Sequence, residues 1–328
     1  MNPLQILFAL TCLISSTSLV ANAQDAATSY PNKPVKIISP FAPGGATDIL
    51  ARILAQKLGE AWKQTIVVDN KSGGGGLIAA TEVARAPNDG YTLLLGTVGP
   101  IEILPSLMKK VPYDPERDFA GVDILVNVEN VLVVNNQLPV KNISELIAYA
   151  KANPGKVNMA SSGSGTSIHM SGELFKSLTK TYMLHLPYKG SNPALTDLIA
   201  GNTDIMFDNL PSSINFIRAG RLKAIAVTSA KRTPSFPELP TIAEAANLPS
   251  YEASSWFGIV LPANMPPELA NRISTEVIKA VKSPAVREQL IAMGAEPVGN
   301  TNAQFAEFIK QEIAKWTKVV KDSGAKVD

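Results

Sequence analysis

Apolar residues along this chain gather in short β-rich runs that alternate with longer stretches of helical periodicity. This alternation is typical of an α/β fold with mostly parallel sheets. The strands predicted from it are residues 35–38, 66–69, 92–95, 132–134, 157–160, 205–207 and 224–227. We therefore expect sheets covered by helices.

One helix is predicted directly after the first strand. Its apolar residues Leu50, Ile53, Leu54 and Leu58 lie at helical spacing and should face a sheet. Gly59 is expected to end this helix in a left-handed conformation.

Two further regions are predicted to be helical. One helix should begin at Asn142, where Glu145 follows at the spacing of a capping box, and end before the Asn-Pro-Gly of residues 153–155. After residue 266 the pattern is mainly helical, over residues 267–281, 284–293 and 302–321. We expect these last helices to pack back onto the first domain, and residues 233–250 to form an irregular surface loop.

The chain is long enough for two domains, and two extended runs indicate where they join. Residues 124–134 and 254–261 have the β-prone composition of strands that cross between lobes. The predicted first domain is discontinuous, with residues 24–126 plus 252–328. The second domain, residues 127–251, is inserted into it.

The amino terminus resembles a secretion signal. An apolar run over residues 4–20 precedes Ala21-Asn22-Ala23-Gln24, which has the small-x-small form of a cleavage site. We predict a signal peptide over residues 1–23, cleaved after Ala23, and a periplasmic mature protein. The single cysteine, Cys12, lies within that segment, so disulfides and cysteine–zinc sites are not expected in the mature chain. An uncleaved membrane anchor is the alternative.

Charge and composition restrict the partners. The chain has 30 basic and 28 acidic residues, a net charge of +2, and no basic stripe, so nucleic acid is not expected to bind. With only two histidines and no His-Glu-x-x-His motif, neither a metal nor a cofactor is expected. We also expect a monomer.

The most informative motif is a glycine turn at residues 39–48, between a predicted strand and a predicted helix. Gly44 and Gly45 lack a Cβ atom, so the backbone can approach a ligand closely, and the following N–H groups lie at the positive end of the helix. A carboxylate or phosphate is the chemistry that suits this turn. The alternative is a structural bend in which Thr47 and Asp48 only cap the helix.

A similar turn lies in the inserted domain at residues 159–169. Its hydroxyl groups, on Ser161, Ser162, Ser164 and Thr166, can donate to a carboxylate alongside the backbone. A Ser/Gly linker with a helix cap is the alternative, but one such turn in each lobe favours a shared site. A third run, residues 72–76, contains four consecutive glycines and could serve either packing or the cleft.

Three further side chains are candidates for ligand contact. His169 follows the second turn and either faces the cleft or holds the loop from behind. Lys189 lies in a turn that could present it to an anion, or it is a solvated surface residue. Asp208 follows a predicted strand at the sheet edge where open α/β sheets bind ligands. Phe41 and Trp256 could shield a ligand, although such residues are more often core.

A periplasmic hydrolase is the rival class. Ser164, His169 and Asp208 could be written as a catalytic triad, but no Gly-x-Ser-x-Gly elbow and no dinucleotide fingerprint accompany them. An enzyme is therefore not expected.

Taken in order, these motifs resemble the Bug receptors, the extracytoplasmic solute receptors of tripartite tricarboxylate transporters. The resemblance rests on the first turn, on residues 162–169 and on the segments 187–190 and 201–209, and runs from about residue 30 to the carboxyl end. It implies a type II periplasmic-binding-protein fold whose two lobes close on a small organic acid, and membrane permease subunits as partners. Carried over by residue, it implies a ligand site at Phe41, Ala42, Gly44, Gly45, Thr47, Asp48, Ser162, Gly163, Ser164, Thr166 and Asp208.

One stretch departs from the pattern of that family. After the third predicted strand many relatives have Asn-Pro, a small residue, Leu and Tyr, whereas this chain reads Leu-Pro-Ser-Leu-Met over residues 104–108, with Glu102 just upstream. If Glu102 faces the cleft, its charge should disfavour ligands with a second ionised acid. A solvated glutamate outside the site is the alternative.

Overall fold

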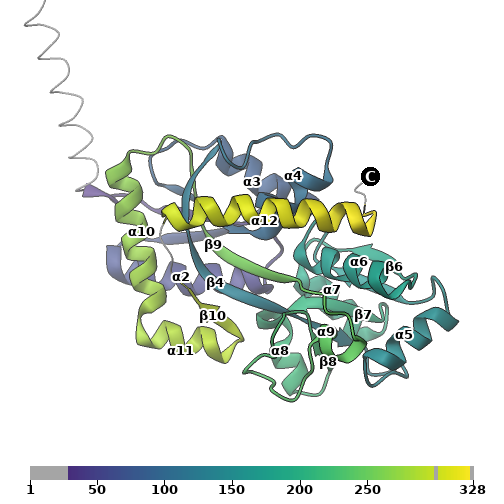
Figure 1. Ribbon diagram of the computed structural model, residues 1–328. Helices are drawn as coiled ribbons and strands as arrows, with labels where there is room; N and C mark the ends of the chain where they lie inside the picture. Colours follow the sequence, from purple (N-terminus) through teal and green to yellow (C-terminus); the bar gives the residue numbers. More distant parts are fainter. Residues whose placement is uncertain (1–28, 299–301, 326–328) are drawn as a thin grey trace, which may run out of the picture.

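One long strand, β4 (Phe119–Val134), runs through both lobes of the molecule. The computed structural model describes residues 29–298 and 302–325, so the expected signal peptide and its cleavage site lie outside the described residues. Residues 119–129 of β4 pair in the sheet of the first lobe and residues 130–134 pair in the sheet of the second (Figure 1). The predicted domain boundary at residue 126 falls within this strand.

The first-lobe sheet is mixed. Its strands besides β4 are β1 (Val35–Ser39), β2 (Ile66–Asn70), β3 (Thr92–Thr97), β9 (Ser254–Pro262) and β10 (Ala295–Pro297). β1 pairs in parallel with β2 and β3, whereas β9 runs antiparallel between β3 and β4 and β10 pairs antiparallel with β4. Parallel pairing therefore holds only for the βα units, as expected where a helix makes the crossover.

The second-lobe sheet follows the same plan. Its strands besides β4 are β5 (Asn158–Ser161), β6 (Leu184–Pro187), β7 (Ile205–Asn209) and β8 (Lys223–Val227). β5 pairs in parallel with β6 and β7, while β7 and β8 pair antiparallel with β4. The predicted hinge runs are thus the antiparallel strands β4 and β9, at the centre of the strand order β2-β1-β3-β9-β4-β7-β5-β6.

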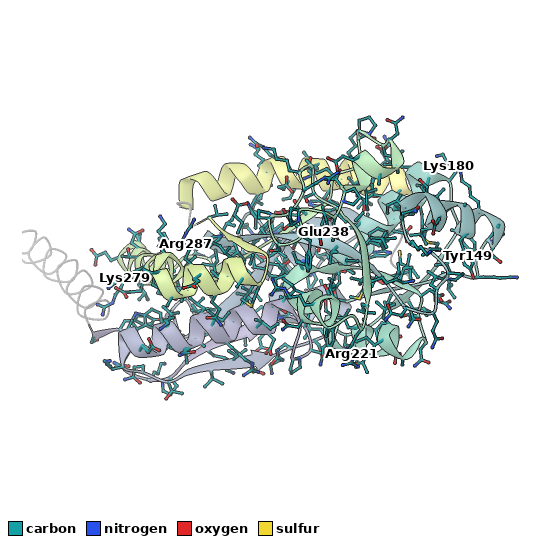
Figure 2. The ribbon with its side chains drawn as sticks, turned by 90° about the horizontal axis from the view of Figure 1, so that it is seen from below. Tyr149, Lys180, Arg221, Glu238, Lys279 and Arg287 are labelled. Carbon is teal, nitrogen blue, oxygen red and sulfur yellow. The ribbon has the colours of Figure 1, made fainter. Side chains whose placement is uncertain are left out.

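Helices cover both sheets. Those of the first lobe are α2 (Ala46–Trp62), η1 (Gly74–Gly76), α3 (Leu77–Ala84), η2 (Gly99–Ile103), α4 (Leu104–Leu107), α10 (Pro267–Lys282), α11 (Pro284–Ala292) and α12 (Asn302–Ser323). Those of the second lobe are α5 (Ile143–Ala152), α6 (Ser167–Thr179), α7 (Ser191–Ala200), α8 (Leu210–Arg218) and α9 (Ile242–Ala246). Figure 2 shows the charged residues that it labels, Lys180, Arg221, Glu238, Lys279 and Arg287, spread over both lobes. None of the described helices has the length and apolar character needed to cross a bilayer.

The apolar face predicted for α2 is buried against the first sheet. Leu50, Leu54 and Leu58 are each at most 4% exposed and belong to one core with Ile37 of β1. Burying a leucine side chain contributes roughly 1.5–3 kcal/mol, so this stripe fixes the helix on the sheet. The first glycine turn is thereby held at the end of β1.

The predicted end of α2 was wrong. Gly59 lies inside the helix, which continues to Trp62, and Lys63 takes the left-handed conformation instead, with φ 54°. The extra turn lets the Trp62 ring pack edge-on against Tyr30, with ring centroids 5.5 Å apart. Tertiary packing therefore outweighs the helix-ending tendency of the glycine.

The predicted start and end of α5 are confirmed, whereas the loop predicted after β8 contains a short helix. The Asn142 side chain accepts a hydrogen bond from the Glu145 backbone N–H (2.9 Å), and α5 ends at Ala152, as predicted. The loop expected over residues 233–250 is not wholly irregular, because it contains α9 with a capping box between Thr241 and Glu244.

The carboxyl-terminal helix α12 lies across both lobes rather than on the first alone (Figure 1). Ser106 after η2 and Thr317 of α12 share a hydrogen bond of 2.7 Å, and Ser177 of α6 donates to the Asp322 carbonyl (3.1 Å). α12 therefore contacts both lobes.

Candidate functional site

Four helices begin at one point between the lobes. Gly45 is the N-cap of α2, Thr166 the N-cap of α6, Asn209 the N-cap of α8, and Ser191 the first residue of α7. All four line the same pocket. Each helix start carries N–H groups without a carbonyl partner inside the helix and the positive end of a helix dipole, so their convergence favours an anion.

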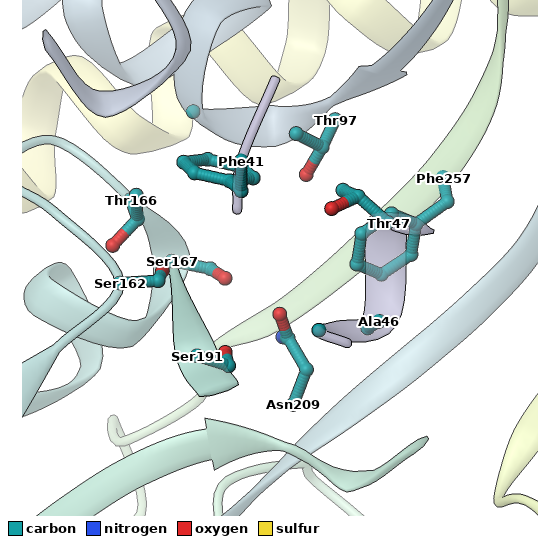
Figure 3. Close-up of a pocket in the computed structure, with 12 residues that line it drawn as sticks. Phe41, Ala46, Thr47, Thr97, Ser162, Thr166, Ser167, Ser191, Asn209 and Phe257 are labelled. Carbon is teal, nitrogen blue, oxygen red and sulfur yellow. The ribbon is translucent and has the colours of Figure 1, made fainter. Parts of the chain in front are cut away.

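The pocket is small and lined mainly by neutral polar groups (Figure 3). Its other lining residues are Phe41, Ala46, Thr47, Thr97, Gly99, Ser162, Ser167 and Phe257. In this closed arrangement its volume is about 10 Å³, close to the space that one water requires. A whole organic acid therefore enters only if the lobes separate or the walls move.

The lobes touch directly around this pocket. The Ala42 N–H of the first turn donates to the Lys189 carbonyl (2.9 Å), and the Ala46 N–H donates to the Ser212 hydroxyl (2.9 Å). Both bonds join the first lobe to the second. Ala42 is thus placed at the seam between lobes rather than among the residues lining the pocket.

The predicted glycine turn of the first lobe is held by Asp48. Gly44 takes φ 86° and its N–H donates to the Asp48 carboxylate (3.0 Å), which also accepts from Arg52 Nε (2.9 Å). Burial acts to raise the pKa of Asp48, but the bonds from Arg52 and Gly44 outweigh it and lower the pKa. Gly44 and Asp48 do not line the pocket, and they shape the loop that presents Gly45, Ala46 and Thr47.

The second glycine turn is fixed from behind by two stacked histidines. The Gly165 N–H donates to His169 Nδ1 (3.2 Å), and the Gly163 N–H donates to Ser161 Oγ (3.1 Å), which in turn contacts His185 Nε2 (2.7 Å). The two imidazole rings are 4.0 Å apart. Burial, with His169 beside it, lowers the pKa of His185 to about 3. His169 therefore lies behind the loop and outside the pocket lining.

His169 is also linked to a carboxylate on α6. Its Nε2 lies 3.4 Å from Glu173 Oε1, and that oxygen accepts from Lys176 Nζ (2.6 Å). Burial acts to raise the pKa of Glu173, but the bonds from His169 and Lys176 prevail and lower it to about 2. Both ring nitrogens of His169 therefore have partners within the protein, Gly165 of the loop at Nδ1 and Glu173 of α6 at Nε2.

Asp208 is completely buried beside the pocket. Its Oδ1 accepts a hydrogen bond from Ser191 Oγ (2.6 Å), and the next residue, Asn209, lines the pocket. Burial raises the pKa of Asp208 to about 7, while the bond from Ser191 acts to lower it. Asp208 thus contacts the pocket through Ser191 rather than by lining it.

Glu102 fits neither of the two alternatives considered for it, because it is neither solvated nor among the residues that line the pocket. The Glu102 side chain is fully buried, and its Oε1 accepts from Trp256 Nε1 (2.6 Å). Burial, together with Glu312 of α12, raises the pKa of Glu102 well above its usual value. Trp256 shares this cluster under α12, while its neighbour Phe257 faces the pocket.

The three residues of the rival triad are not joined. Ser191 is the side-chain partner of Asp208, and Gly165 and Glu173 are the ring partners of His169. Within residues 29–298 and 302–325, no hydrogen bond connects Ser164, His169 and Asp208, so the arrangement lacks the relay that a triad requires. The described side chains also include no group of three or more His, Cys, Asp or Glu residues suited to a metal.

The remaining predicted residues line a second chamber. Gly163, Ser164 and Lys189 face a space of about 370 Å³ on the outer side of Phe41 and Ser162. The third glycine run, Gly73–Gly75, lies on its opposite wall. This run approaches the second turn so closely that a Cβ atom on Gly75 would lie 2.1 Å from the Ser164 carbonyl oxygen.

Several pocket residues were missed by the sequence reasoning. These are Ala46, Thr97, Gly99, Ser167, Ser191, Asn209 and Phe257. Thr97 and Asn209 end strands whose cores were predicted, so extending each strand to its carboxyl end would have found them. Ser191 opens a helix directly after Gly190, the same signal that marked the other two turns.

The comparisons with known proteins agree with this geometry. A family model described as the tripartite tricarboxylate transporter family receptor matches residues 50–325. BugT of Bordetella pertussis, strain Tohama I, is 37% identical over the whole of both chains. The match extends over every element described above.

Two solved structures are also similar. R. palustris Rpa4515, solved with adipate, is 40% identical with a TM-score of 0.88, and covers 91% of this chain and 100% of its own. MatC (Rpa3494) from Rhodopseudomonas palustris, solved with bound malate, is 32% identical with a TM-score of 0.85, over 89% of this chain and 100% of its own. With its two-lobed periplasmic-binding-protein fold, the chain therefore belongs to the receptor family of the tripartite tricarboxylate transporters.

Proposed function

We propose that this protein captures one small organic acid between its lobes and delivers it to the membrane subunits of a tripartite tricarboxylate transporter. The observation that carries the proposal is the convergence of four helix N-termini on one pocket, on Gly45, Thr166, Ser191 and Asn209. Backbone N–H groups at such ends bind carboxylates without a cationic side chain. In relatives, adipate and malate are the acids named with the solved structures.

Two tiers of residues support the ligand in this proposal. Gly45, Thr47 and Ser162 contact the carboxylate with N–H and hydroxyl groups, and Phe41 covers it. Thr166 lines the pocket as the cap of α6, with its hydroxyl donating to the Gly163 carbonyl. The others position these groups or lie at the entrance, namely Ala42, Gly44, Asp48, Gly163, Ser164, His169, Lys189 and Asp208.

The cellular setting is part of the same proposal. Export to the periplasm with cleavage after Ala23 would place the receptor on the side of the membrane where a transporter collects its substrate. We further propose that it acts as a monomer, with the domain boundary inside β4, because this strand passes from one sheet to the other.

Calorimetry and product analysis test this function together. The mature protein is unfolded and refolded to remove retained ligand, then titrated with malate, succinate and adipate. At least one acid should bind one per chain, raise the melting temperature by mass action and be recovered unchanged. Chemical conversion of a bound acid would favour an enzyme, and absence of binding by every small carboxylate would overturn the receptor function.

A further inference from the structure

Asn130 lies where β4 passes from the first sheet to the second. Glu129 is the last residue of β4 that pairs with β9, opposite Ser254, and Asn130 is the first that pairs with β7, opposite Asn209. The Asn130 side chain is completely buried. A buried amide needs partners for both its donor and its acceptor, so the partners of Asn130 show which parts of the molecule it joins.

The two partners of the Asn130 amide lead to different helices of the pocket. Its Oδ1 accepts from Asn209 Nδ2 (2.6 Å), and its Nδ2 donates to Ser171 Oγ (3.0 Å). The Ser171 hydroxyl in turn donates to the Ser167 carbonyl (2.8 Å), one turn earlier in α6. Asn209 is the N-cap of α8, Ser167 is the first residue of α6, and both line the pocket (Figure 3). One side chain on β4 therefore links two of the four helix starts.

The pairing of strands does not by itself hold these two helix starts together. β5 leads to α6 and β7 leads to α8, and the two strands pair in parallel at Met159–Ile205 and Ala160–Met206. Both chains continue past the last of these pairs before their helices begin. The contacts of Asn130 act in that interval, at the level of the pocket.

The backbone of Asn130 is also fixed, so its side chain is held from a stable position. Its carbonyl accepts from the Thr228 N–H (2.9 Å), directly after β8, which pairs with β4 in the second sheet. On the first-lobe side, the hydroxyl groups of Ser255 in β9 and Thr97 of the pocket share a hydrogen bond of 3.3 Å. The pocket is thus bonded to both strands of the predicted hinge.

We propose that Asn130 is a positioning residue for the bound acid, because it sets the separation of the α6 and α8 starts from the strand that both lobes share. Donor groups bind an anion well only if they are held in place beforehand. This inference rests on the proposed function, since the helix starts matter in this way only if they bind the acid. Asn130 does not line the pocket, so its loss should weaken every small carboxylate by the same factor.

Asn130→Ala removes both links, and Asn135→Ala is its matched control. Asn135 is also buried, follows β4 directly, and donates from Nδ2 to the Leu198 carbonyl of α7 (2.6 Å), away from the pocket lining. Both variants should lower the melting temperature. Calorimetry below both transitions should show that only Asn130→Ala binds malate, succinate and adipate more weakly, by roughly five- to twentyfold and equally for each acid that the wild type binds.

Ser171→Ala is a milder test that does not depend on the folding of Asn130→Ala. It removes one hydroxyl and with it only the link to α6, so each acid should bind roughly two- to fivefold more weakly. The double variant should bind no more weakly than Asn130→Ala alone, because the same link is already broken.

Three results would overturn the positioning role and leave the receptor function intact. These are wild-type affinity in Ser171→Ala, an equal loss of affinity in Asn130→Ala and Asn135→Ala, and losses that multiply in the double variant. Failure of the unmodified protein to bind any acid would instead count against the receptor function.

Discussion

Among single residues, Asp208 is a titratable group that is hydrogen-bonded to a residue of the pocket lining, Ser191. It is fully buried, and its contact with the pocket passes through the Ser191 hydroxyl. The Ser213 hydroxyl and the Asn209 backbone N–H also act to lower the pKa of Asp208, but less strongly than burial raises it. An ionised carboxylate in this position is poorly solvated, which is why burial raises the pKa of Asp208 to about 7.

This shift predicts a pH-dependent stability. An unfolded aspartate releases its proton near its ordinary pKa of 3.8, whereas folded Asp208 keeps it to about pH 7. Between these values folding takes up a proton, so the free energy of unfolding falls as pH rises. Asp208→Asn should remove this loss. Between the unfolded and the folded pKa of Asp208, the free energy of unfolding of the variant should rise relative to that of the wild type by up to about 4 kcal/mol.

Urea unfolding at about pH 5 and about pH 8 measures the gain. Ser191→Ala is a useful comparison, because it removes the hydrogen bond that favours ionised Asp208 and should extend the fall of stability to higher pH. A wild type and an Asp208→Asn protein that differ by the same amount at both pH values would show that Asp208 titrates normally.

For Glu102 we predict that its charge has no effect on ligand preference, because its carboxyl lies outside the pocket lining. Glu102→Gln keeps an oxygen that accepts from Trp256 Nε1 and removes only the ability to ionise. The ratio of suberate to octanoate affinity should therefore stay within about twofold of the wild type. Calorimetry decides the matter, and a clear shift toward the diacid would mean that the charge of Glu102 reaches the ligand.

The candidate site shows which residues a sequence can identify. Phe41, Gly45, Thr47, Ser162 and Thr166 were found because glycine turns between a strand and a helix have a recognisable composition. Trp256 was considered as a shield for the ligand, with a core position as the commoner alternative, and it lies in a core cluster, whereas Phe257 lines the pocket. Successive strand residues point to opposite faces, and without the partner elements the sequence does not say which face of β9 is covered by α12.

At the scale of elements, strand positions were predictable and their pairing was not. The seven predicted strands all occur within observed strands or overlap them, because apolar β-branched runs are a local signal. The antiparallel insertion of β9 between β3 and β4 depends on contacts far apart in the chain. The end of α2 likewise depended on the packing of Trp62 against Tyr30, which no local pattern contains.

The third glycine run lies against the second glycine turn, which belongs to the other lobe. Gly75 has φ +63° and would place a Cβ atom 2.1 Å from the Ser164 backbone oxygen of the other lobe. Gly74 has φ +57°, but a Cβ atom there would meet only Leu77 of its own lobe, at 3.1 Å. The two positions therefore share backbone strain and differ in the contact between lobes.

Gly75→Ala and Gly74→Ala form a matched pair. Each should lose about 1–2 kcal/mol of stability, because alanine is strained in a left-handed conformation. Only Gly75→Ala should also weaken acid binding, by roughly tenfold or more, since the closed state must shift to relieve the backbone clash. Calorimetry with the best acid compares them, and equal affinities would show that this seam plays no part in closure.

At the scale of the whole molecule, opening and closing must occur on the side of the glycine turns. The lobes meet there through hydrogen bonds from the Ala42 N–H to the Lys189 carbonyl and from the Ala46 N–H to the Ser212 hydroxyl, and through close packing of the glycine turns. The strand β4 runs continuously through both lobes, and α12 packs on both (Figure 1). The strands β4 and β9 are therefore the natural position of a hinge.

This arrangement predicts that an acid makes the protein more compact in solution. A carboxylate bound where the four helices begin would contact both lobes at once, so a bound acid should favour the closed form. Small-angle scattering should show a smaller radius of gyration when a stabilising acid is saturating. Gly75→Ala, saturated with the same acid, should compact less, because its clash persists only in the closed form. An acid that raises the melting temperature without changing the radius of gyration of the wild type would contradict closure by the hinge.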